Sequence, residues 1–160
     1  MNQFKAIHER KHRLDRACYV GNVAVCYTAC IRQHKPLFQD AIIACEFTRI
    51  LFDECKKHRC ELQAYIFMPD HVHVIIQGKD EQADTWKSMS LFKQRTGFWL
   101  SQHKHDVEWQ KDFYDHIIRD TKNLEKQIRY ILNNPVRKEL VADWKEYKFK
   151  GSSIYNFDEW

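Results

Sequence analysis

Residues 68–76 constrain the fold more than any other part of the sequence. From position 71 to 76, the side chains His, His and Ile alternate with Val, Val and Ile. A period of two predicts a β-strand with one apolar face and one face that is partly polar. The dipeptide at positions 69–70 is Pro-Asp, a turn sequence, and residues 62–68 are apolar enough to form the paired strand. This stretch therefore predicts a hairpin at the heart of a sheet.

His71 and His73 fall on the same face of the predicted strand. Their Cα atoms are expected to lie roughly 6.6–6.8 Å apart, so both imidazoles can lean toward one cation. The alternative is a strand face that carries two partly exposed histidines and binds nothing, because motifs this short often occur by chance.

Length and composition indicate a single globular domain over residues 1–160, with 44% hydrophobic and 14% aromatic residues. No apolar run approaches the ~18 residues of a membrane span. The first residues are polar and contain no apolar signal-peptide core, so we expect a cytoplasmic protein without a membrane partner. The six cysteines match no paired zinc motif, and most are expected to be reduced core residues.

The net charge of +4 is compatible with a nucleic-acid partner without requiring one. Residues 1–16 form a basic arm, and residues 140–160 are expected to be an irregular tail. The arm can be a solvated segment or a contact to phosphates, and composition does not separate the two. The candidate DNA contacts in it are Arg10, Lys11, Arg13 and Arg16.

The order of predicted elements is strand, helix, two strands, helix, strand and helix. Asp40 is a candidate N-cap for the first helix, and Pro135 requires the last helix to stop near position 134. This order predicts an α+β domain with an antiparallel sheet and helices on one face, in a ferredoxin-like or RNA-recognition-like arrangement. The predicted ranges are 19–31, 40–57, 60–68, 71–77, 85–103, 113–118 and 120–134.

The last predicted helix has an apolar stripe and a polar face. On a helical wheel, Tyr130 and Asn134 lie one turn apart on the polar face, away from the stripe. The alternative is a surface tyrosine followed by an asparagine that ends the helix. The apolar stripe consists of Leu124, Ile128, Ile131 and Leu132.

Combined with the histidine pair, this polar face makes chemical sense. Two imidazoles and one amide oxygen would supply three ligands to a divalent cation and leave sites open for a phosphate. A tyrosine beside the cation could attack phosphorus and form a covalent intermediate. Within the sequence there is no phosphate-binding loop of the Gly-x-x-x-x-Gly-Lys type and no His-Glu-x-x-His motif.

Three motifs, in this order, resemble one family. His71-Val-His73 is similar to the His-hydrophobic-His signature of HUH endonucleases. It is followed by Trp-Gln at 109–110 with Phe-Tyr-Asp-His-Ile-Ile-Arg at 113–119, and by Tyr-Ile-Leu-Asn-Asn-Pro-Val-Arg at 130–137. Together they resemble the single-tyrosine transposases of the insertion-sequence type, most closely the REP-associated tyrosine transposases. The resemblance runs from about position 19 to position 155.

The resemblance implies a role for each site residue. His71 and His73 would bind a divalent metal, Mg²⁺ or Mn²⁺, with Asn134 as third ligand, and Tyr130 would be the nucleophile.

Lys93 and Arg95 fall where relatives place a basic helix near DNA. His116 falls where the family often has histidine, and no role is assigned to it.

The resemblance also implies the HUH endonuclease fold and an activity. The protein would cleave and rejoin single-stranded DNA at hairpin-forming repeats through a 5′-phosphotyrosine intermediate, as a monomer or homodimer. Two other functions stay open. One is a non-catalytic module that binds single-stranded nucleic acid, and the other is a small metallohydrolase in which the histidines activate water.

Overall fold

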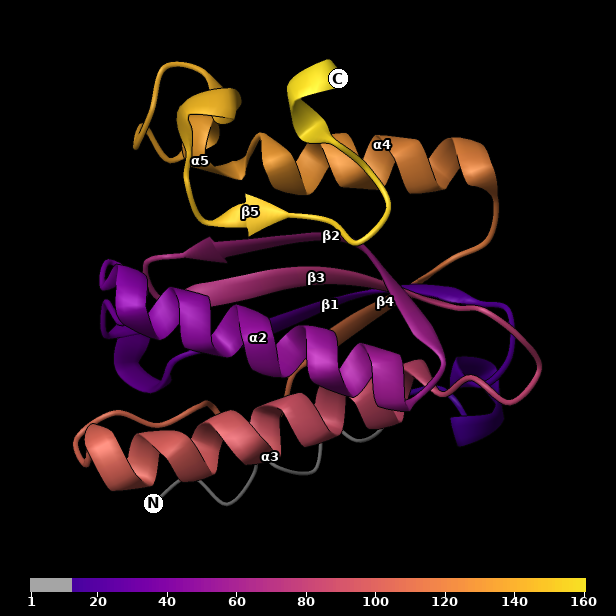
Figure 1. Ribbon diagram of the computed structural model, residues 1–160, viewed down its shortest axis with the longest axis horizontal. Helices are drawn as coiled ribbons and strands as arrows, with labels where there is room; N and C mark the ends of the chain where they lie inside the picture. The colour runs from indigo at the N-terminus through magenta and orange to yellow at the C-terminus, as the bar shows by residue number, and fades with distance from the viewer. Residues whose placement is uncertain (1–12) are drawn as a thin grey trace.

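Five antiparallel strands form one sheet in the order β4-β1-β3-β2-β5. The computed structural model describes residues 13–160 (Figure 1). The central strand β3 pairs with β1 on one side and β2 on the other, so the predicted hairpin at the heart of the sheet is confirmed. The strands are β1 (Ala24–Cys30), β2 (Cys60–Met68), β3 (His71–Gly78), β4 (Tyr114–Ile118) and β5 (Lys150–Gly151).

The helices α2, α3 and α4 begin where the sequence supplies capping carboxylates. The side chain of Asp40 accepts a hydrogen bond from the amide of Ile42 at the start of α2. Asp84 and Asp120 cap α3 and α4 in the same way. The helices are α2 (Ala41–Lys57), α3 (Thr85–His103), α4 (Thr121–Leu132) and the single turn α5 (Asn134–Arg137). Short 3-10 turns occupy Arg16–Tyr19, Arg32–His34, Trp144–Glu146 and Phe157–Glu159.

Helices cover both faces of the sheet, which corrects the prediction that they lie on one face (Figure 1). Helices α2 and α3 pack on the face that carries Val72, Val74 and Ile76. Helix α4 and the C-terminal segment pack on the opposite face, where Ile66 and Ile75 belong to a second hydrophobic core. The reason is physical: residues of both strand faces are apolar, so each face needs a cover that excludes water.

Three element boundaries differ from the sequence prediction. The first strand begins at Ala24 rather than at position 19, because residues 16–19 form a 3-10 turn and Gly21 adopts φ 97°. The last predicted helix is divided at Asn133, which ends α4 before Pro135 opens the turn α5. The tail contains the short strand β5, which pairs with β2 at the edge of the sheet. Within residues 13–160, no helix combines the length and the apolar character needed to cross a membrane.

A buried carboxylate joins α2 to α3. Glu54 is 2% exposed and accepts hydrogen bonds from Arg95 of α3 and from Lys57, whose Nζ lies 3.2 Å away. Burial would raise the pKa of Glu54, but the hydrogen bonds from Arg95 and Lys57 outweigh it and hold the pKa below its usual value. Arg95 therefore serves as a structural partner between two helices.

Arg95→Met should lower the free energy of unfolding, because it leaves a buried carboxylate with one cationic donor fewer. We expect a loss of about 1–3 kcal/mol, less than for a fully buried pair because Lys57 still donates. Urea denaturation measures the change. Arg49→Met is the matched control, since Arg49 makes exposed ion pairs on α2, and its effect should be clearly smaller. Equal losses in the two variants would contradict the role given to Arg95.

Candidate active site

The two histidines of β3 project from the sheet face that α4 covers. Their ring centroids lie 4.8 Å apart, and the ring planes are inclined by 84°. Both residues are partly buried. The rings are therefore close enough, and suitably turned, for one nitrogen of each to address the same small cation.

Each histidine is oriented through its Nδ1 atom. Nδ1 of His73 lies 2.7 Å from the hydroxyl of Thr28 on β1, and Nδ1 of His71 donates to the carboxylate of Asp70 at 2.6 Å. Such partners commonly fix the tautomer and the ring direction of metal-binding histidines. When both Nδ1 atoms carry the proton, the Nε2 atom of each ring has a lone pair that can bind a metal.

Burial keeps His73 uncharged. Burial, together with the charges of His71 and Arg137, lowers the pKa of His73 to about 3. A neutral imidazole is the form that binds metals.

The turn before His71 is held by the segment after β1. The amide of Ile31 donates to the carbonyl of Asp70 at 2.8 Å, and the amides of Leu37 and Phe38 donate to the carbonyl of Pro69. In the same segment, His34 adopts φ 53° and its Nδ1 lies 2.8 Å from the second carboxylate oxygen of Asp70. A left-handed non-glycine residue costs on the order of 1–3 kcal/mol, so these contacts must hold the turn firmly.

Tyr130 and Asn134 come from the other side of the site. Tyr130 lies in the last turn of α4 and is 55% exposed, whereas Asn134 opens α5 and is 5% exposed. This end of α4 packs on the sheet face that carries the histidines, through the side chains of Ile128, Ile131 and Leu132. The expected stripe is buried at these three positions, and Leu124 packs against it in part.

The donor set fits a divalent cation that also binds a phosphate. Within residues 13–160, no three His, Cys, Asp or Glu side chains gather as a ready ligand cluster. The available donors are the Nε2 atoms of His71 and His73 and the amide oxygen of Asn134. Asn134 Oδ1 accepts one hydrogen bond, from Arg137 at 3.3 Å, and a carbonyl oxygen has a second lone pair to offer.

Lys93 and Arg95, the predicted DNA contacts of α3, lie across the sheet from the histidines (Figure 1). The ammonium of Lys93 donates to the carbonyls of Gln110, Lys111 and Asp112. Burial lowers the pKa of Lys93 to about 8. Both cations are thus engaged inside the protein, and the structure does not bring them to the candidate site.

The described part of the basic arm is also paired with carboxylates. Arg16 donates to Asp84 at 2.8 Å, and Arg13 lies 3.6 Å from Asp115. Arg10 and Lys11 lie outside the described residues. The DNA contacts assigned to these cations stay predictions.

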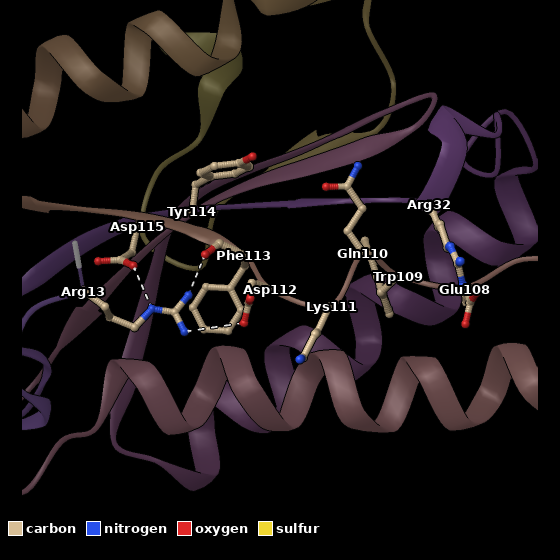
Figure 2. A pocket seen from close by; sticks show the side chains of 10 residues that line it. All are labelled: Arg13, Arg32, Glu108, Trp109, Gln110, Lys111, Asp112, Phe113, Tyr114 and Asp115. Carbon is tan, nitrogen blue, oxygen red and sulfur yellow. Dashed lines mark hydrogen bonds and ion pairs between the residues drawn. The ribbon is translucent and has the colours of Figure 1, made fainter. Parts of the chain in front are cut away.

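A groove of about 1000 Å³ runs along residues 108–115 at the β4 edge of the sheet. Figure 2 shows Arg13 on the α3 side of β4, joined to Asp112, Asp115 and the carbonyl of Phe113, while Tyr114 points to the opposite side. Arg32 in this groove pairs with Glu108. His116 lies on β4 opposite Cys26 and is exposed, and within residues 13–160 no partner assigns it a role. Neither histidine of the pair lines the groove.

Sequence reasoning missed three residues of the site: Thr28, Asp70 and Arg137. Asp70 directly precedes His71, so adjacency was an available indication. Thr28 lies beside His73 because β1 pairs with β3. Arg137 contacts Tyr130 across the interruption of the helix at Asn133.

Two curated relatives are similar to this chain. A REP-associated tyrosine transposase of Haemophilus influenzae is 29% identical over 118 residues, which cover 65% of this chain and 67% of the relative. A REP-associated tyrosine transposase of Escherichia coli is 32% identical over 92 residues, covering 52% of this chain. The match spans about half the length of the second relative (51%).

Two solved structures share the fold. One is a REP-associated tyrosine transposase bound to a REP hairpin, with a TM-score of 0.72, 21% identity and coverage of 87% of this chain and 80% of the other. The second, described as a transposase from Deinococcus radiodurans, has a TM-score of 0.52 at 19% identity, covering 76% of this chain and 96% of the other. At these identities the likeness establishes the α+β fold.

The family assignment comes from the match to a family model. The model described as "Transposase IS200 like" matches residues 20–134. That range includes β1, the histidine pair, Tyr130 and Asn134. The chain belongs to the IS200-like transposase family, and within it resembles the REP-associated tyrosine transposases.

Proposed function

We propose that this protein is a metal-dependent transposase that cleaves and rejoins single-stranded DNA through a 5′-phosphotyrosine intermediate. The observation that supports the proposal is that two oriented histidines project from the sheet face on which α4 packs, and that α4 and α5 contribute a tyrosine and an amide at their junction. Membership in a transposase family supports DNA as the substrate.

Each residue has a part in the proposed reaction. His71, His73 and Asn134 would hold Mg²⁺ or Mn²⁺, which when bound polarises the scissile phosphate. The phenol oxygen of Tyr130 loses its proton to water and forms a bond to phosphorus, while the bond from phosphorus to the 3′ oxygen breaks. The 3′ oxygen takes up a proton, which leaves a 5′-phosphotyrosine and a free 3′-hydroxyl. Attack by a 3′-hydroxyl on the phosphotyrosine reverses these steps and rejoins the strand.

We propose hairpin-forming repeats as the DNA partner. The support is the relative whose structure was solved with a REP hairpin. Tyr130 would act with the histidines of its own chain, because α4 packs on the sheet face of that chain from which the histidines project. A monomer is then sufficient for the chemistry, and a homodimer is not required. The cytoplasm stays the predicted location.

Tyr130→Phe should abolish the covalent adduct with single-stranded hairpin DNA, because no hydroxyl remains to attack phosphorus. Stability should change by less than about 0.5 kcal/mol, since the side chain is largely exposed. The adduct is measured on a denaturing gel and mapped by peptide sequencing. Tyr114→Phe, which alters another exposed tyrosine, is the control and should keep the adduct.

The same gel separates the three candidate functions. A binding module would retain DNA without cleaving it, and a metallohydrolase would cleave without leaving an adduct. An adduct in Tyr130→Phe, or one mapped to another tyrosine, would overturn the proposed nucleophile.

Thr28→Val should weaken Mn²⁺ binding, because it removes the hydroxyl that orients His73. Loss of such an outer partner typically costs about 10- to 100-fold in affinity. Electron paramagnetic resonance of Mn²⁺ measures the change without DNA. Thr48→Val is the matched control, since the Thr48 hydroxyl donates to the carbonyl of Ala44 within α2 and does not orient a histidine of β3. Unchanged Mn²⁺ affinity in both Thr28→Val and His73→Ala would show that the metal lies elsewhere.

A further inference from the structure

One guanidinium contacts both residues that the α4–α5 junction contributes to the site. The guanidinium carbon of Arg137 lies 3.9 Å from the centroid of the Tyr130 ring. Its Nη1 donates to the backbone carbonyl of Tyr130 at 3.0 Å, and its Nη2 donates to Asn134 Oδ1 at 3.3 Å. A single planar group therefore touches the proposed nucleophile and a proposed ligand at once.

The helix is interrupted between Tyr130 and Asn134, and this interruption makes the contacts of Arg137 important. Tyr130 belongs to α4 and Asn134 to α5, and Asn133 lies between the two helices. Within a continuous helix the backbone hydrogen bonds would fix both side chains relative to each other. Here α5 is a single turn, joined to α4 by backbone hydrogen bonds of Asn133, and the side-chain contacts of Arg137 add to these bonds in fixing the two residues.

Arg137 is not neutralised by an acidic side chain. Among the ion pairs of residues 13–160, none includes Arg137, whereas Arg129 on the same helical segment pairs with Glu125. Its charge thus remains available beside the place where a phosphate would bind. A cation stacked on an aromatic face is also attracted by the ring.

We propose that Arg137 is a positioning residue for the attack of Tyr130. Its guanidinium holds the phenol ring and the amide of Asn134 as one unit, so that the hydroxyl is directed at the phosphate while the amide oxygen is directed at the cation. This inference rests on the proposed function. Lysine cannot replace the contacts, because an ammonium cannot stack flat on the ring and donate along two fixed directions.

The test compares Arg137→Lys, Arg137→Gln and the control Arg129→Lys. Arg129 also lies over an aromatic ring, that of Trp160, and forms an exposed ion pair, so it matches Arg137 in type but not in place. Three quantities are measured with a single-stranded hairpin oligonucleotide and Mn²⁺: the single-turnover rate of adduct formation, the Kd for DNA, and the Mn²⁺ affinity without DNA.

Both Arg137 variants should slow adduct formation by roughly 10- to 100-fold, because a small misplacement of a reacting group costs that much. The Kd for DNA should change much less than the rate in Arg137→Lys, which keeps the charge. Mn²⁺ affinity of Arg137→Lys should fall by up to about 10-fold, because the Asn134 amide is less well held. Arg129→Lys should match the wild type in all three.

Four outcomes would overturn the inference. These are a wild-type rate in Arg137→Lys, an equal slowing in Arg129→Lys, a weaker Kd for DNA that accounts for the whole effect, or unchanged Mn²⁺ affinity with an unchanged rate. Circular dichroism checks the fold, and Arg137→Lys serves if Arg137→Gln does not fold. If the wild type forms no adduct, the proposed function fails and this inference fails with it. An adduct that is indifferent to Arg137 overturns only the inference.

Discussion

The pairing of β3 between β1 and β2 is the constraint on which both faces of the protein depend. Val72, Val74 and Ile76 point toward α2 and α3, so the register that buries them necessarily turns the two histidines to the other face. A slip of one residue would bury the imidazoles among the apolar side chains under α2 and α3 and would turn the valines to the α4 face. One strand register determines both which side chains are buried in the core and which way the histidines point. A shift of register would therefore disrupt the core together with the site.

The candidate site is assembled from two halves with different supports. The histidine half is fixed by the sheet, by Thr28 on the neighbouring strand and by the turn at Asp70, which backbone hydrogen bonds from residues 31–38 hold in place. The tyrosine half depends on the packing of α4 and on contacts across the break at Asn133. Movement within the site is therefore expected in the tyrosine half, where fewer bonds fix the geometry.

Local patterns in the sequence predicted most of the fold. The alternation at 71–76, the capping aspartates and Pro135 act over a few residues, and the helices at 41–57 and 85–103 match the expected ranges closely. Long-range features were not accessible in this way. The second covered face follows from apolar residues on both sides of β2 and β3, and the contact between Thr28 and His73 exists only once β1 pairs with β3. The break before α5 follows from Pro135, but the contact of Arg137 with Tyr130 depends on the folded path of the chain.

Charge was the least reliable guide, for a physical reason. Net charge counts cations without saying where their partners lie, and Arg13, Arg16, Lys93 and Arg95 each have carboxylate or carbonyl partners in the fold. A cation beside a carboxylate contributes little field at a distance, because the two charges cancel and salt screens the remainder over about 8 Å. Arg137, on the face of the histidines, has no carboxylate partner within residues 13–160 and can act on a phosphate at short range. The position of Arg137 therefore matters more for the proposed chemistry than a net charge of +4 spread over the chain.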